Sequence, residues 1–208
     1  MIHGDTRLIM SSSYSSLVKD IQIGKIEGED PVSDFIRSEF GIDTIVAGHA
    51  NKAWDLEVVG VYAPYVEEKR IRNKDRLIKK FESKFGHTFE IKRDMVSDRT
   101  GNFFFEVFSN IRVNNPGCIA ASKADMLVIV TRKEFIFINR GLFLSWIISN
   151  LYYDNEFSRG WKMRTCKKVK EVELKSSLIS PQVRGILIPL DDIKKEASVG
   201  VFKRGVIV

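Results

Sequence analysis

Apolar residues recur at helical spacing in several parts of the chain, and these parts are predicted to be helices. Residues 29–40 carry an apolar stripe that ends at Gly41, and residues 67–85 carry a second stripe that ends at Gly86. The stripes consist of Val32, Phe35, Ile36 and Phe40 in the first helix and of Ile71, Ile78, Phe81 and Phe85 in the second. Residues 118–125 suit a short helix, and residues 141–153 predict a helix that is apolar around most of its circumference.

Other runs alternate apolar and polar residues, or are apolar over only a few positions, which is typical of strands. They cover residues 54–62, 88–93, 103–108, 126–130, 135–138 and the basic stretch 161–175. Because strands and helices alternate along the chain, the fold class is α/β, with a mixed β-sheet flanked by helices. The stretch "SSSYSS" marks residues 1–20 as a mobile N-terminal segment, and residues 21–208 form a single domain.

Composition narrows the range of partners and compartments. The chain has 208 residues, of which 44% are hydrophobic, and this suits one core of ordinary size. A net charge of +6 favours a polyanionic partner. Cys118 and Cys166 fit neither a disulfide framework nor a metal-ligand spacing, and no signal peptide is visible. The apolar run 141–153 is too short to span a bilayer, so we expect a cytoplasmic protein that does not enter membranes.

The stretch "FEIKRD" raises a question about an acid and a base that lie two residues apart. In a strand, Glu90 and Lys92 point to one face while Phe89 and Ile91 point to the other. The simplest interpretation is an amphipathic strand with one solvent-facing side. The alternative is that the two charges belong to a site, and other acidic residues favour it.

Three acids precede elements or lie on elements that could pack side by side. Glu29 opens the first helix, Asp55 opens the strand that follows, and Glu90 lies on the next strand. Carboxylates on adjacent elements can converge on one Mg²⁺ ion, which takes oxygen ligands and keeps several waters. A lysine beside such an ion can orient a water and offset negative charge in the transition state. Asp30 and Glu39 are alternatives to Glu29 as the helix acid.

This ordered set resembles the PD-(D/E)XK superfamily of nucleases. The stretch "GEDPVSDFIRSEFGIDTIVAGHANKAWDLEVVG" is similar to archaeal Holliday junction resolvases. The later stretches "FEIKRD", "TGNFFFEVFSN" and "GCIAASKADMLVIV" look more like small nucleases of phages and archaeal viruses, and the resemblance covers roughly residues 22 to 140. Trp54 stands where the family motif has proline.

The resemblance implies a restriction-endonuclease-like core and a role for each residue of the set. Glu29 would be the helix acid near the metal, Asp55 and Glu90 would bind Mg²⁺ or Mn²⁺, and Lys92 would be the catalytic lysine. The implied function is a metal-dependent endonuclease acting on single-stranded or branched DNA, in the host cytoplasm if the protein is viral. A Holliday junction resolvase is one alternative, and a nucleic-acid-binding protein that has lost catalysis is another.

Basic residues are the candidates for contacts with DNA phosphates. A strand across 161–175 would place Lys162, Arg164, Lys168 and Lys170 on one face, and Lys123 in "ASKAD" could touch phosphate beside Ser122. Eight further basic residues lie on the 67–85 helix. Glu106 could be an additional acid near the metal or a solvent-facing strand residue, and Asp94 could support Lys92 or cap a turn.

The 141–153 helix has more apolar surface than one core-facing stripe requires, so either the core surrounds it or a second subunit packs against part of it. The resemblance to resolvases favours the second alternative, a two-fold homodimer. This helix or the neighbouring strand 135–138 would contribute to the interface.

Overall fold

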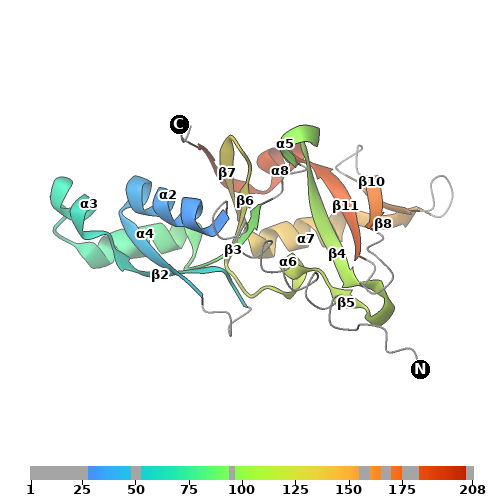
Figure 1. Cartoon of the computed structure of the whole chain (residues 1–208), viewed down its shortest axis with the longest axis horizontal. Helices are drawn as coiled ribbons and strands as arrows, with labels where there is room; N and C mark the ends of the chain where they lie inside the picture. Colours follow the sequence, from blue (N-terminus) through green and yellow to red (C-terminus); the bar gives the residue numbers. More distant parts are fainter. Residues whose placement is uncertain are drawn as a thin grey trace, which may run out of the picture.

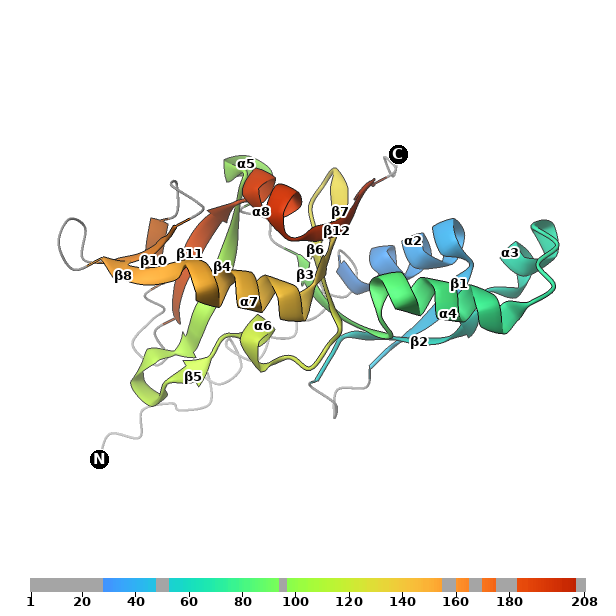
Figure 2. The same cartoon turned by 180° about the vertical axis from the view of Figure 1, so that it is seen from behind.

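A computed structural model describes residues 28–47, 53–93, 97–154, 160–164, 170–174 and 183–204. The molecule is elongated, with α2, α3, α4 and β2 towards one end and β4, β5, β8 and β11 towards the other (Figure 1). The view from behind has the same arrangement, with β3, β6 and β7 between the two ends (Figure 2). The segments predicted to be mobile, residues 1–20, lie outside the described residues.

A mixed six-stranded sheet in the order β1-β2-β3-β6-β7-β12 joins the two ends. Its strands are β1 (Ile42–Val46), β2 (Leu56–Val61), β3 (Thr88–Arg93), β6 (Met126–Val130), β7 (Glu134–Asn139) and β12 (Ser198–Lys203). Neighbouring strands are antiparallel except for β3 and β6, which run parallel. The expected α/β class with a mixed sheet is therefore confirmed.

One face of this sheet packs on two helices through a core rich in phenylalanine. The helices are α2 (Asp30–Phe40) and α4 (Lys74–Phe85). The core contains Phe81, Phe85, Phe89 and Phe137, and every second residue of β6, starting at Met126, points into it. Strand alternation is what divides the uniformly apolar β6 between this core and a second one.

The second core lies on the other face of the sheet. It is formed by α7 (Arg140–Asn150), α8 (Leu190–Glu196) and a four-stranded sheet. That sheet has the order β10-β11-β4-β5, with β10 (Lys170–Leu174), β11 (Val183–Pro189), β4 (Asn102–Asn110) and β5 (Asn115–Pro116). Short one-turn helices, α5 (Ser97–Thr100) and α6 (Cys118–Ala121), and the 3-10 turn η2 (Ile111–Val113) flank β4 in sequence.

The single helix predicted over residues 67–85 is wrong, because two helices occupy this part of the chain. α3 (Ala63–Glu68) ends before Arg70, which has a positive φ of 53°, and α4 begins at Lys74. The side chain of Asn73 accepts a hydrogen bond from the Arg76 N–H, so Asn73 caps the N-terminus of α4. This local cap competes with continuation of the helix.

The predicted helix 141–153 is shorter than expected, since α7 ends at Asn150 and β8 (Leu151–Asp154) follows. Phe143 and Ile147 are buried in the second core, whereas Leu142 and Ile148 are 67% and 74% exposed. The core thus covers one side of the helix only. The 135–138 strand is buried on both faces and lies between β6 and β12, so it offers no surface to a partner.

The single basic strand predicted over residues 161–175 is also wrong. Its residues belong to β9 (Gly160–Met163), which pairs with β8, and to β10, which pairs with β11 in another sheet. Lys162 lies on β9, Arg164 follows it, and Lys170 opens β10. Lys168 lies outside the described residues. The four basic residues therefore do not share one face of one strand.

Candidate active site

Asp55 lies directly before β2 and is tied to β3 by two hydrogen bonds. The Asp55 N–H donates to the Phe89 carbonyl at 2.8 Å, and Asp55 Oδ2 accepts from the Ile91 N–H at 2.6 Å. Because Leu56 pairs with Phe89 in the antiparallel β2–β3 ladder, Asp55 lies opposite Glu90. The structure thus brings these two predicted metal ligands together.

Lys92 forms an ion pair with Glu90, with 2.6 Å between Nζ and Oε1. Glu90 is only 6% exposed. Register places Glu90 beside Leu127 and Lys92 beside Ile129, on the face of the central sheet that β4 and α7 cover. The interpretation of "EIK" as a strand with a solvent-facing side is therefore wrong, because the second core shields that side near β3.

Burial and neighbouring charges shift the pKa values of Asp55 and Lys92 in this cluster. Burial raises the pKa of Asp55 and the neighbouring Glu90 raises it further, although the Ile91 N–H and Lys92 lower it. Burial lowers the pKa of Lys92, but Cys118, Glu90 and Asp55 outweigh this effect and hold that pKa above its ordinary value. Two carboxylates thus repel each other beside one lysine that stays protonated.

Glu106, the possible additional acid, lies on β4. Glu106 and Cys118 extend the cluster towards this strand. Glu106 Oε1 accepts a hydrogen bond from the Cys118 N–H at 3.2 Å, and the Cys118 side chain interacts electrostatically with Lys92. Burial raises the pKa of the Cys118 thiol, while Lys92 lowers it. No spacing rule singles out Cys118, since only packing of α6 on β4 brings it here.

Close approach of two backbones fixes α6 in this place. The Gly117 N–H donates to the Val107 carbonyl at 3.1 Å. A Cβ atom at Gly117 would lie 1.9 Å from the Glu106 carbonyl oxygen, so only glycine fits between α6 and β4.

The loop that carries Asp55 is anchored by residues 122 and 123. Ser122 Oγ donates to the Ala53 carbonyl at 3.0 Å and the Lys123 N–H donates to the same oxygen at 2.9 Å. Ser122 is buried and also accepts from the Ala124 N–H, so its hydroxyl serves this loop. The Lys123 side chain is exposed next to the loop, and its contact with phosphate stays a prediction.

The helix acids lie on the other side of β3. The backbone of Gly28 lies against Ile91 and Arg93, whose side chains point to the opposite face of β3 from Glu90 and Lys92. Glu29, the next residue, therefore lies on the α2 side of β3. Its part in the site stays a prediction, as does that of Asp30. Glu39 lies about 15 Å from Glu29 along the helix axis. Asp94 lies outside the described residues.

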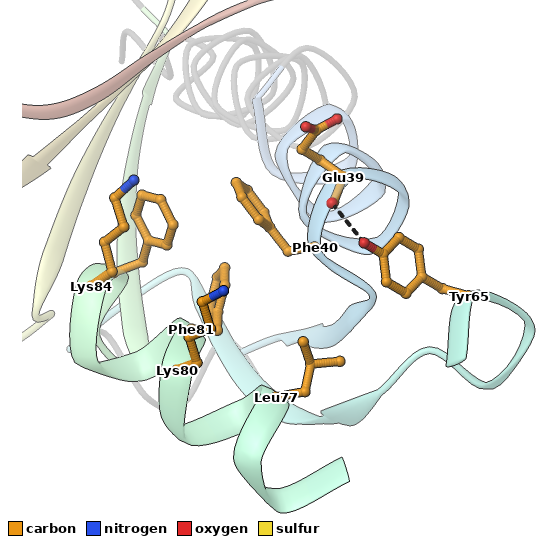
Figure 3. Close-up of a pocket in the computed structure, with 8 residues that line it drawn as sticks. Glu39, Phe40, Tyr65, Leu77, Lys80, Phe81 and Lys84 are labelled. Atoms are coloured by element: carbon orange, nitrogen blue, oxygen red, sulfur yellow. Dashed lines mark hydrogen bonds between the residues drawn. The ribbon is translucent and has the colours of Figure 1, made fainter. Parts of the chain in front are cut away.

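A surface pocket of about 300 Å³ occupies the far end of α2 and is separate from this cluster. Glu39, Phe40, Tyr65, Leu77, Lys80, Phe81, Lys84 and Phe85 line it. The labelled side chains come from α2, α3 and α4, with Tyr65 donating a hydrogen bond to the Glu39 carbonyl (Figure 3). Because α2 and α4 cover the face opposite Glu90 and Lys92, this pocket does not open onto them.

The oxygen donors suit a hard cation such as Mg²⁺ or Mn²⁺. The described residues contain no group of three or more His, Cys, Asp and Glu side chains that could hold a metal ion. When a cation is bound, Asp55 and Glu90 would supply two ligands, and water or phosphate oxygens would supply the others.

Comparison of the chain with protein-family models, with curated proteins and with solved structures finds no match in any of the three. In the described part of the chain, no helix is long and apolar enough to cross a membrane.

Proposed function

We propose that this protein is a metal-dependent DNA endonuclease with a restriction-endonuclease-like core. The observation that carries the proposal is the cluster in which the half-buried Asp55 lies opposite the buried Glu90, and Glu90 pairs with Lys92. Two neighbouring carboxylates that repel each other and are partly removed from water destabilise a fold, and groups perturbed in this way cluster at functional sites. The order of these residues, an acid opening β2 and E-x-K on β3, is the order of the nuclease motif that the sequence resembles.

Each residue of the cluster has a definite part in this proposal. Asp55 and Glu90 would hold Mg²⁺ or Mn²⁺, which when bound supplies polarisation of the scissile phosphate and activation of a water. The raised pKa of Lys92 keeps its ammonium protonated, so Lys92 would stabilise charge on the phosphate rather than act as a general base. Its ion pair with Glu90 fixes the position of the ammonium before substrate arrives.

Metal dependence is the first expected result. Labelled single-stranded, duplex, flap and four-way-junction DNA should be cleaved with Mg²⁺ or Mn²⁺ and left intact with EDTA, because the ligands are carboxylate oxygens. Ca²⁺ should support binding better than cleavage. Denaturing gels with each metal measure both the requirement and the preferred DNA. Cleavage that persists in EDTA would reject the mechanism.

A homodimer is the second expected result. The α7 residues that remain outside the core, Gly141, Leu142, Ser145, Ile148 and Ser149, share one face of the helix. Their small and apolar side chains suit close packing against the same face of a second copy. Analytical ultracentrifugation at micromolar concentration should give twice the 23.8 kDa chain mass.

Variants can assign this interface. Changing Leu142 and Ile148 to glutamate should give a monomer, whereas Ile45→Glu, a matched change of a residue 52% exposed on β1, should leave the dimer intact. A monomeric wild-type protein would refute the dimer. It would also remove most of the case for the alternative function, Holliday junction resolution, which needs two active sites related by two-fold symmetry.

The alternative of another class is a nucleic-acid-binding protein that has lost catalysis. Retention of both carboxylates and of the lysine in one buried cluster favours the enzyme. Phosphate contacts from Lys123, Lys162, Arg164, Lys168 and Lys170 would give affinity for DNA without sequence preference in either case.

A further inference from the structure

Trp54 occupies an unusual place for a tryptophan, directly before Asp55 and outside both hydrophobic cores. Neither core includes it, and within the described residues its ring contacts no other aromatic ring. Its side chain is only partly buried. Large aromatic residues usually contribute most when they fill a core. Packing of the described cores therefore does not explain this residue.

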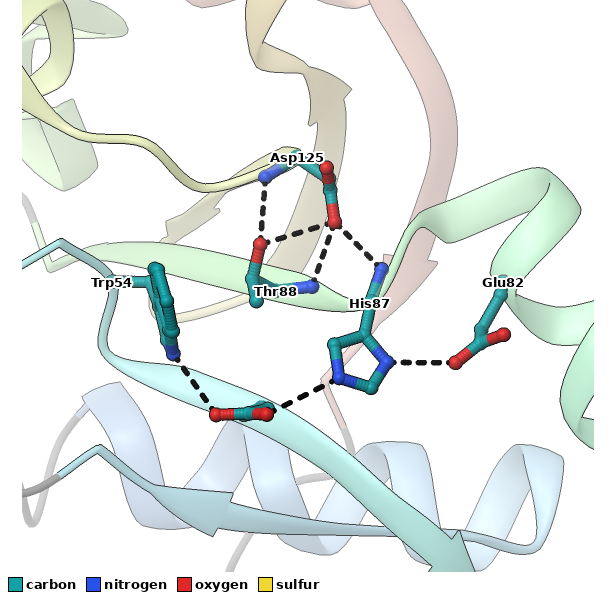
Figure 4. Close-up of polar contacts among 6 residues, drawn as sticks. Trp54, Glu82, His87, Thr88 and Asp125 are labelled. Atoms are coloured by element: carbon teal, nitrogen blue, oxygen red, sulfur yellow. Dashed lines mark hydrogen bonds and ion pairs between the residues drawn. The ribbon is translucent and has the colours of Figure 1, made fainter.

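A chain of polar contacts holds the indole ring in one orientation. Trp54 Nε1 donates to Glu57 Oε2 at 3.3 Å, and Glu57 Oε1 lies 3.2 Å from His87 Nε2. His87 Nδ1 lies 2.7 Å from Glu82 Oε1, so the chain ends on α4 (Figure 4). Because the imidazole lies between two carboxylates, the pKa of His87 is raised, first by its hydrogen bond to Glu82.

The backbone on both sides of this chain is equally fixed. Asp125 Oδ2 accepts from the N–H groups of His87 and Thr88 and from the Thr88 hydroxyl, at 2.8 to 3.0 Å (Figure 4). The loop before Asp55 is bound through the Ala53 carbonyl, as described above. The loop that carries Trp54 is thus anchored on both sides, and the hydrogen bond to Glu57 orients the indole ring.

These constraints limit what the ring can offer to a ligand. Its single donor is already used by Glu57, so the indole cannot read the hydrogen-bonding edge of a base. The side chain is partly exposed, and aromatic faces stack on nucleobases of any sequence. A base inside a duplex is already stacked and paired, so only an unpaired base is free to stack on a protein ring.

We propose that Trp54 stacks on an unpaired nucleobase next to the proposed site of Asp55, Glu90 and Lys92, and that the substrate is therefore DNA that is single-stranded at the point of cleavage. This inference rests on the proposed nuclease function and specifies its substrate class. Glu57 acts through Trp54 as a positioning residue, since it orients the ring without reaching the DNA itself.

Binding measured without cleavage tests the inference. Fluorescence anisotropy in the presence of Ca²⁺ measures the affinity for a single-stranded oligonucleotide and for the duplex of the same sequence. The proteins compared are the wild type, Trp54→Ala and Trp54→Phe. Trp54→Ala should weaken single-strand binding by about 10- to 100-fold and duplex binding by less than about 3-fold. Trp54→Phe should retain most of the single-strand affinity, because it keeps a stacking face.

Two further variants separate stacking from structural damage. Val59 is an apolar residue 53% exposed on β2, the strand that follows Trp54. Val59→Ala should change neither the single-strand nor the duplex affinity. Glu57→Ala should lose part of the single-strand affinity, and the double variant with Trp54→Ala should bind no more weakly than Trp54→Ala alone. Equal losses of Trp54→Ala on single-strand and duplex DNA would overturn the inference.

The outcome is distinguishable from failure of the nuclease proposal. If no DNA is cleaved with any metal while the Trp54-dependent preference for single strands persists, the nuclease proposal fails and the stacking role stands. If DNA is cleaved but Trp54→Ala lowers kcat/KM equally for single-stranded and duplex DNA, the stacking role is rejected and the nuclease proposal stands.

Discussion

Asp55→Asn is expected to abolish DNA cleavage while leaving the metal-free protein at least as stable as the wild type. The asparagine oxygen can still accept the Ile91 N–H bond, so the loop keeps its position. What the variant loses is the negative charge that would bind the cation. We expect kcat/KM to fall by at least about 10²- to 10³-fold, as when one charge-stabilising group is removed from an active site.

The stability part of this result follows from the sign of the pKa shift. Because the pKa of Asp55 is raised in the folded protein, folding favours its protonated form. The ionised carboxylate therefore destabilises the fold at neutral pH, and this penalty grows as pH rises from the unfolded-state pKa to the folded-state pKa. A neutral amide removes the penalty, so the melting temperature of the metal-free variant should be unchanged or higher.

Metal binding gives a readout that does not depend on catalysis. Mg²⁺ at about a hundredfold its dissociation constant should raise the melting temperature of the wild-type protein by roughly 5–10 °C, because it binds only the folded state. Asp55→Asn and Glu90→Gln should lose this increase. Lys92→Met should lose cleavage but keep metal-induced stabilisation and much of the DNA binding, since both carboxylates remain.

The matched control is Asp191→Asn, which neutralises a carboxylate 96% exposed on α8. It should change neither activity nor the response to Mg²⁺. An Asp55→Asn protein that still cleaves DNA, or that melts several degrees below the wild type without metal, would contradict the assigned role.

Phe137→Ala is expected to produce the largest loss of stability among single substitutions of a core phenylalanine by alanine. Phe137 is fully buried in the central strand β7. Its ring centroid lies 5.3 to 6.3 Å from those of Phe35, Phe85, Phe89 and Phe202, which belong to α2, α4, β3 and β12. Removing the ring leaves a cavity at the junction of all four elements, at a cost of about 3–5 kcal/mol in the free energy of unfolding.

Urea denaturation followed by circular dichroism measures this loss. Phe137→Leu, which fills more of the space, should lie between Phe137→Ala and the wild type and provides a measurable variant if the alanine protein does not fold. Val113→Ala, a change of a residue 69% exposed at the end of η2, should alter the free energy of unfolding by less than about 0.5 kcal/mol. A Phe137→Ala loss below about 1 kcal/mol would mean that the phenylalanine core is not packed as described.

Local patterns were sufficient for elements whose boundaries carry a strong chemical signal. The first helix ends at Gly41, whose φ of 69° is the left-handed conformation that glycine adopts at low cost, and its backbone N–H closes the last turn on Arg37. The uniformly apolar runs of β6 and β7 are central strands, as expected for strands covered on both faces. The break between α3 and α4 was missed because apolar spacing continues through it, while the Asn73 cap decides the boundary.

The sequence by itself singled out the residues that are proposed to carry the chemistry. The two-residue period of a strand groups Glu90 with Lys92, and Asp55 joins them through its order in the chain, as an acid that opens the preceding strand. Their environment is a different matter. The same period that groups Glu90 with Lys92 is equally compatible with a solvent-facing side, and nothing near them in sequence excludes water.

Only the tertiary structure decided that this side is buried and which groups surround it. β4 and α6, which follow β3 in sequence, and α7, which follows β7, fold over Glu90 and Lys92. They add Glu106 and Cys118 to the cluster, while burial raises the pKa of Asp55. Contacts of this kind join residues far apart in the chain, and desolvation depends on all the atoms that exclude water rather than on any local pattern.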